Sequence, residues 1–197
     1  MASITLQDIN TKAEIRKKTA KPLLWIGIVS IVMFFSGWTS AVIVSKGGDG
    51  NWLNIQMPVA FTISLFIILL SSVSYHFGFV SIKNNKINNL KIATFLTLIL
   101  GVLFVFSQFL GWKDLYASGI VATGASSTNA SSYIYLITVF HVLHLLAGII
   151  SLIVVFVKSI KEKYNASDYL GVEVSLIYWH FLGILWVYLF FFLKYIA

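Results

Sequence analysis

Residues 133–157 read YIYLITVFHVLHLLAGIISLIVVFV, and none of these 25 positions holds Asp, Glu, Lys or Arg. A helix of that length is about 37 Å long and crosses the hydrocarbon layer of a bilayer, which is about 30 Å thick. Backbone groups cannot stay unpaired in lipid, so such a stretch must be helical. The sequence predicts an all-α integral membrane protein with five transmembrane helices in a bundle, because four further stretches are similarly apolar, at 23–45, 57–82, 90–112 and 171–196.

The composition of the whole chain fits this class. Of its 197 residues, 58% are hydrophobic and 11% are charged, whereas soluble domains carry about 25% charged residues. The lack of cysteine excludes a disulfide framework and a thiolate metal site. The formal charge of +7 comes from Lys and Arg in short segments between the apolar runs, not from a patch on a folded face, so nucleic acid is not an expected partner.

Lys and Arg are distributed unevenly between the two ends of the predicted helices. Positive residues favour the cytoplasmic side, so we expect a cytoplasmic N-terminus and a C-terminus outside. Residues 1–22 then form a basic cytoplasmic segment ahead of a membrane domain at 23–197, and residues 5–22 are either a short surface helix or a mobile tail. The basic residues expected on the cytoplasmic side are Lys12, Arg16, Lys17, Lys18, Lys21, Lys83, Lys86, Lys91, Lys158, Lys161 and Lys163, and those on the other side are Lys46, Lys113 and Lys194.

Small and polar residues recur at a spacing near 3.5 within each apolar run, which places them along one side of a helix. In lipid, small residues let helix backbones approach closely, and polar residues form bonds between helices. We therefore expect these stripes to face the interior of the bundle or a partner. The stripes are Gly27, Ser30, Gly37 and Ala41; Ser64, Ser71, Tyr75 and Gly78; Gly101, Gln108 and Gly111; His141, His144, Gly148 and Ser151; and Glu173, His180 and Gly183.

Ionisable residues inside a bilayer are costly and are functional candidates by default. Glu173 is the one acid within a predicted span, and His141, His144 and His180 lie deeper. Two stacked haems need ligands more than a dozen positions apart on one helix, and a carboxylate di-iron site needs several Glu residues, so neither site fits. Two interpretations stay open: hydrogen bonding between helices with contact to lipid headgroups, or a single haem between His144 and His180.

The last apolar run carries the most specific pattern. Tyr178-Trp179-His180-Phe181, with Glu173 ahead and Trp186 behind, resembles the last helix of subunit III of the haem–copper oxidases. The chain is similar to the short five-helix bacterial form of that family, which lacks two additional N-terminal helices, and the resemblance extends from residue 23 to the C-terminus. The other runs match motifs of the same family in chain order: Ser30, Val32-Met33-Phe34-Phe35 and Gly37; Ser71-Ser72; Leu100-Gly101, Phe104 and Gln108; and Thr138, His141-Val142-Leu143-His144 and Gly148.

Several residues depart from the family pattern. Ile31 replaces a buried Glu, Gly111 replaces an acid that often follows the Gln, and Gly183 replaces the Asp that usually follows Trp-His-Phe. Two glycines around His141 have become Val139 and Val142. Any part that the three missing acids play in proton handling is therefore not transferred to this chain.

The resemblance implies a non-catalytic accessory subunit of a bacterial haem–copper terminal oxidase, a cytochrome c oxidase of aerobic respiratory electron transport in the cytoplasmic (inner) membrane. Haem and copper are then expected in partner subunits and not in this chain. The implied partners are catalytic subunit I, subunit II and phospholipid, with a larger respiratory supercomplex as a further partner. The chain would stabilise the catalytic subunit and support proton uptake.

A core polar cluster or a lipid cleft is the expected site, and Trp179→Ala is expected to weaken association with the catalytic subunit or with lipid. Two alternatives stay open: the equivalent subunit of a quinol oxidase, and a small membrane cytochrome or transporter that uses the histidines directly. The residues of the expected cluster or cleft are Glu173, His180, His141, His144, Trp179 and Gln108.

Overall fold

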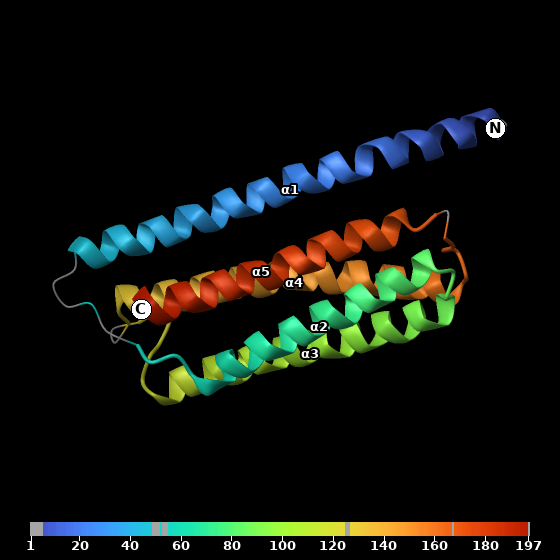
Figure 1. Cartoon of the computed structure of the whole chain (residues 1–197). Helices are drawn as coiled ribbons and strands as arrows, with labels where there is room; N and C mark the ends of the chain where they lie inside the picture. The colour runs from blue at the N-terminus through green and yellow to red at the C-terminus, as the bar shows by residue number, and fades with distance from the viewer. Residues whose placement is uncertain (1–5, 49–51, 53–54, 125–126, 167, 197) are drawn as a thin grey trace.

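The structure is a computed structural model that describes residues 6–48, 52, 55–124, 127–166 and 168–196. Each of its helices is long and apolar enough to cross a membrane, and the two termini lie at opposite ends of the bundle (Figure 1). The predicted all-α fold with five transmembrane helices is therefore confirmed. The helices are α1 (Leu6–Gly48), α2 (Val59–Lys83), α3 (Ile87–Ala117), α4 (Asn129–Ile160) and α5 (Leu170–Ile196).

From α2 onward, consecutive helices lie side by side and run in opposite directions (Figure 1). α2 and α3 are joined by a tight turn in which Asn85 has a φ of 59°, a left-handed conformation that Asn tolerates better than most residues. α4 begins with a capping box. The backbone amide of Ser131 donates to Thr128 Oγ1 at 3.2 Å, and the amide of Thr128 donates to Ser131 Oγ at 3.0 Å. These local signals mark where α3 and α4 start.

Glycines allow the helices α2 to α5 to pack closely. A Cβ added to Gly78 would lie 2.8 Å from the Cβ of Ala93, so α2 and α3 touch almost backbone to backbone. At Gly101 and Gly148, an added Cβ would meet the indole of Trp179, at 2.8 Å and 3.2 Å. Small residues have this effect in membrane bundles. The small stripes of α2, α3 and α4 thus contribute to the interior of the bundle.

α1 is arranged differently from the other helices. Within the described residues it contacts α4 and α5 but neither α2 nor α3, and Figure 1 shows it standing apart from that pair. Cβ atoms added at Gly27 and Gly37 would have no neighbouring atom within 4 Å. These two members of the α1 stripe therefore do not pack closely against another helix of this chain.

From residue 6 onward, the basic segment ahead of the first span is part of helix α1 and not a separate element. α1 begins at Leu6 and continues through Pro22 into the membrane-spanning part without a break. The described portion is therefore neither a surface helix at an angle to the span nor an irregular tail, whereas Thr5 lies outside the described residues.

Below, the N-terminal end of the bundle means the end that holds the start of α1 and the α2–α3 and α4–α5 connections. The opposite end is called the C-terminal end.

Candidate functional site

A buried polar layer joins α2, α3 and α5 in the half of the bundle near the C-terminal end. Ser64 Oγ accepts hydrogen bonds from Gln108 Nε2 at 2.9 Å and from Trp186 Nε1 at 3.1 Å. The same hydroxyl donates to the carbonyl of Phe61 at 2.7 Å. Ser64, Gln108 and Trp186 are all fully buried. Hydrogen bonds of this kind hold membrane helices in a fixed register, so Gln108 acts here as a helix-to-helix connector.

His141 borders this layer but makes no hydrogen bond in it. Its ring stacks on the indole of Trp186, with centroids 5.0 Å apart, and meets the ring edges of Phe104 and Phe35. Neither ring nitrogen of His141, nor Oε1 of Gln108, has a hydrogen-bond partner among the described residues. His141 therefore packs as an aromatic ring, and its two buried ring nitrogens have no hydrogen-bond partner among the described residues.

Trp179 forms the centre of the other half of the bundle. Its side chain is fully buried, and Nε1 donates to Ser71 Oγ at 2.8 Å. The indole lies against Gly101 of α3 and Gly148 of α4. One side chain of α5 thus contacts all three helices α2, α3 and α4, and the two glycines make the space for it.

His144 lies between α4 and α1, away from the buried layer. Its Nδ1 is 2.7 Å from the carbonyl of Phe140, so the proton of this bond belongs to Nδ1. The rings of Phe34 and Phe35 from α1 pack against it at 6.1 Å and 5.6 Å. Tyr178 of α5 donates to the carbonyl of His144 at 3.1 Å. The half-buried imidazole therefore links α4 to the separate helix α1.

Glu173 and His180 lie on the outward side of α5. Glu173 pairs with Lys21 of α1 at 2.7 Å near the N-terminal end of the bundle. His180 is half-buried, and its ring centroid lies 5.9 Å from that of His76 on α2. The seven-residue spacing of Glu173 and His180 does put them on one face, and this face lies between α1 and α2.

The comparisons with known proteins decide the family. The model of the cytochrome c oxidase subunit III family matches residues 23–197, which is the whole predicted membrane domain. The chain belongs to the cytochrome c oxidase subunit III family. The resemblance seen in the sequence is thereby confirmed, and with it a place in a cytochrome c oxidase complex as a multi-pass membrane subunit.

Named relatives come from several groups of organisms. Cytochrome c oxidase subunit 3 of Corynebacterium diphtheriae is 30% identical over 166 residues, which cover 81% of this chain and 79% of the relative. The protein of the same name from Thermostichus vulcanus is 27% identical over 172 residues, covering 85% and 82%. That of Mus musculus is 28% identical over 178 residues, covering 83% of this chain but 64% of the relative. The bacterial relatives are thus matched over most of their length.

The structure gives a physical reason for two of the positions at which this subunit III departs from the family pattern. At Gly111 an added Cβ would lie 2.6 Å from the ring of Phe61, so no acidic side chain fits there without repacking. At Gly183 an added Cβ would lie 3.1 Å from Ser72 Oγ, which leaves little more room. Ile31 lines an apolar groove between α1 and α5. The packing around these residues is therefore adapted to uncharged side chains.

The residues expected to form one polar cluster are divided among four places in this subunit III. Gln108 and His141 belong to the buried layer, Trp179 to the centre of the other half, His144 to the contact with α1, and Glu173 and His180 to the outward side of α5. Among the described residues, no hydrogen bond joins Glu173, His141, His144 and His180 to one another. Within the same residues, no group of three or more His, Cys, Asp or Glu side chains is placed to hold a metal ion.

His76 was not singled out from the sequence. The signal was available, because it is an ionisable residue within the second apolar run. No motif of the resemblance includes His76. The stripe of small and polar residues in that run instead includes its buried neighbour Tyr75. Its proximity to His180 depends on how α2 is rotated against α5, which a single sequence does not specify.

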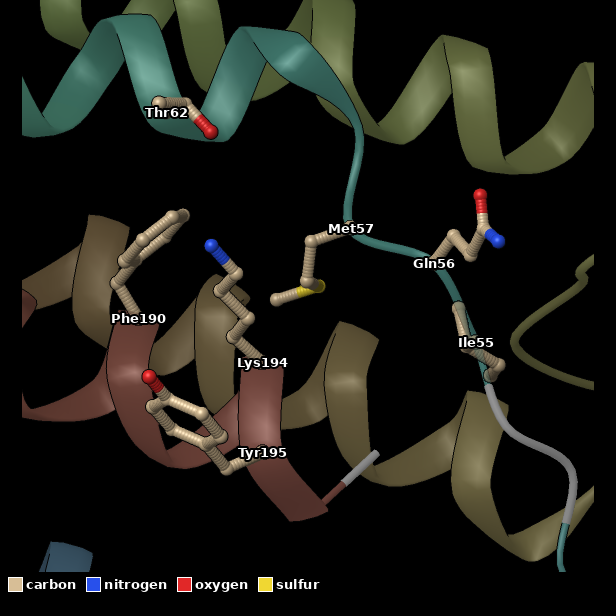
Figure 2. Close-up of a pocket in the computed structure, with 7 residues that line it drawn as sticks. All are labelled: Ile55, Gln56, Met57, Thr62, Phe190, Lys194 and Tyr195. Carbon is tan, nitrogen blue, oxygen red and sulfur yellow. The ribbon is translucent and has the colours of Figure 1, made fainter.

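A pocket of about 460 Å³ opens at the C-terminal end of the bundle (Figure 2). Figure 2 shows the Lys194 ammonium pointing into the space between Met57, Phe190 and Thr62. The ammonium lies 6.0 Å from the centroid of the Phe190 ring, and Gln56 and Tyr195 complete the mouth. The pocket therefore combines a cation at the end of α5 with both polar and apolar side chains.

Proposed function

We propose that this chain is the non-catalytic accessory subunit of a bacterial haem–copper terminal oxidase in the cytoplasmic membrane, where it packs beside catalytic subunit I and subunit II and stabilises them. The observation that carries the proposal is the family match over the complete membrane domain. The contacts support it, because His141 and His144 are used in packing and His144 is bonded to a backbone carbonyl. Cytochrome c is the proposed electron donor of the complex, in line with the names of the relatives.

The proposed orientation places the N-terminal end of the bundle in the cytoplasm. Its basis is the excess of Lys and Arg at that end. The natural absence of cysteine makes a direct test simple, since single cysteines can be placed at Lys86 and Lys161. Both should react with a membrane-impermeant maleimide only in inverted vesicles. Labelling of the two from opposite sides would overturn the proposed topology.

Phospholipid is the proposed ligand of the chain itself. A groove of about 440 Å³ between α1 and α5 is lined almost entirely by apolar side chains, among them Leu24, Ile31 and Val174. The Lys21–Glu173 pair lies next to the groove, and Lys21 is exposed enough to meet a phosphate. An acyl chain in the groove with its phosphate near Lys21 satisfies both features. In this proposal the lipid and the apolar wall of the bundle shield the proton entry region of the catalytic subunit, which supports proton uptake.

Removal of the chain tests its role in the complex. The oxidase is purified from a strain that lacks this subunit and is compared with the complete complex under continuous turnover. We expect unchanged haem content, similar initial activity and earlier loss of activity. Loss of haem from the depleted complex in proportion to the missing chain would instead favour a membrane cytochrome, and an unchanged turnover lifetime would contradict the supporting role.

A further inference from the structure

The outward face between α1 and α2 is the strongest unexplained feature of the molecule. α5 contacts both α1 and α2, but in the described parts of the chain α1 and α2 do not contact each other. Figure 1 shows α5 lying between them. A groove of about 340 Å³ runs along this side of α5, with Val32 and Ser36 of α1 on its wall and Ile184 of α5 in its lining. We define the outward face as Leu69 and His76 of α2 with His180, Ile184 and Phe191 of α5.

Most of this outward face is apolar and exposed. Ile184 is 70% exposed, and Leu69 and Phe191 are exposed as well. The spacing from His180 to Ile184 and Phe191 keeps these residues on one side of α5. On α2, Leu69 and His76 are seven positions apart and likewise share a side. The face is therefore long enough to receive a second helix lying along α5.

Two imidazoles interrupt the apolar surface. The rings of His76 and His180 lie 5.9 Å apart at an angle of 41°, and His76 is exposed whereas His180 is half-buried. Neither ring forms a hydrogen bond to a described residue, unlike His144, whose Nδ1 is bonded to a carbonyl. Polar hydrogens in hydrocarbon are costly without an acceptor. The pair therefore calls for an acceptor from outside this chain.

The depth of the pair separates a protein acceptor from a lipid headgroup. His76 is seven positions from Lys83 at the end of α2, and His180 is ten positions from the start of α5. At 1.5 Å per residue these distances are about 10 Å and 15 Å, whereas Glu173 is only about 4.5 Å from the helix start. Lys21 and Glu173 therefore mark the headgroup level, and the imidazoles lie below it, where lipid supplies acyl chains without acceptors.

We propose that the outward face docks a transmembrane helix of the oxidase's catalytic subunit, and that this helix carries an acceptor side chain, a carboxylate or an amide oxygen, that binds His76 and His180. The proposal rests on the function proposed above, because it requires a partner subunit in the membrane. Leu69, Ile184 and Phe191 supply the apolar contact around the polar pair. Hydrogen bonds between membrane helices commonly join partners in this way.

Photo-crosslinking on the otherwise unchanged complex tests the occupant directly. A photoreactive amino acid is placed at Ile184 and, as a matched control, at Ile150 of α4, which is 63% exposed on a helix that does not contact α2. We expect the Ile184 probe to give an adduct with the catalytic subunit and the Ile150 probe to give far less of it. Adducts of the Ile184 probe with phospholipid alone, or with a second copy of this chain, would overturn the inference.

Substitution of the imidazoles tests the acceptor. His76→Phe and His180→Phe keep an aromatic ring and remove the polar hydrogens. Because an average hydrogen bond between membrane helices corresponds to about threefold in an equilibrium, each variant should lower retention of the chain on the complex by about threefold in mild detergent, and the double variant by nearly tenfold. Full retention of the double variant would contradict the inference. Failure of the unmodified chain to purify with a haem-containing subunit would instead overturn the proposed function, so the two failures are distinguishable.

Discussion

Trp179 is the side chain on which the packing of α2 to α5 depends most, and its replacement gives the sharpest prediction. The indole is fully buried, it fills the space beside Gly101 and Gly148, and Nε1 donates to Ser71 Oγ at 2.8 Å. Truncation of a buried Trp to Ala costs about 3–5 kcal/mol. We therefore expect Trp179→Ala to destabilise the chain by about that amount. Any weaker association with partners should follow from loss of the fold, because Trp179 reaches no outer surface.

The hydrogen bond is separated from the packing by a double-mutant cycle. Trp179→Phe and Ser71→Ala each remove the bond, and their combination removes nothing further from it. The expected coupling is about 0.6 kcal/mol and at most about 1.7 kcal/mol, the range found for hydrogen bonds between membrane helices. The measurement is the unfolding of the purified chain by SDS titration in mixed micelles. A Trp179→Ala chain as stable as the wild type, or a coupling of zero, would refute the packing described here.

Three further predictions follow from single contacts. Gly111→Ala places a Cβ against the ring of Phe61 and should lower the free energy of unfolding by about 1–3 kcal/mol in the same assay. Gly37→Ala, whose Cβ would meet no atom within 4 Å, should leave that free energy unchanged. Equal effects of the two substitutions would contradict the assigned packing. His141→Phe removes two ring nitrogens without partners and should be neutral or stabilising, and a large loss of stability would show that they bind a ligand or water. Lys21→Ala should change stability by less than about 1 kcal/mol, because the pair is partly exposed, yet should reduce the phospholipid retained in native mass spectra; unchanged retention would count against the lipid groove.

The five helices were predictable because hydropathy is a strong signal in lipid, but their ends were not. The fourth helix was expected at 133–157 and extends over Asn129–Ile160, and the third continues to Ala117. These extra turns carry polar residues outside the hydrocarbon layer, where hydropathy gives no information. The same holds for the start of α1 at Leu6, which precedes the first apolar run, at 23–45, by several turns.

The candidate site was predictable as a set of residues but not as an arrangement. Spacing along one helix correctly places Glu173 and His180 on one face. It does not say which face of α5 meets α4 and which is left between α1 and α2. That choice follows from the packing of Trp179 and Trp186 against α2, α3 and α4. His76 was overlooked for the same reason. Its neighbour His180 is determined by the rotation of α2 against α5, which sequence spacing does not specify.

The central claim is that this membrane bundle assembles with a haem-bearing subunit and holds no haem itself. The most direct test is the optical spectrum of the full-length tagged chain, purified first in mild detergent and then separated from its partners. The account predicts a Soret band in the intact complex that stays with the partner subunits after separation. A Soret band that remains with the isolated chain, and that is lost in His144→Phe or His180→Phe, would contradict it.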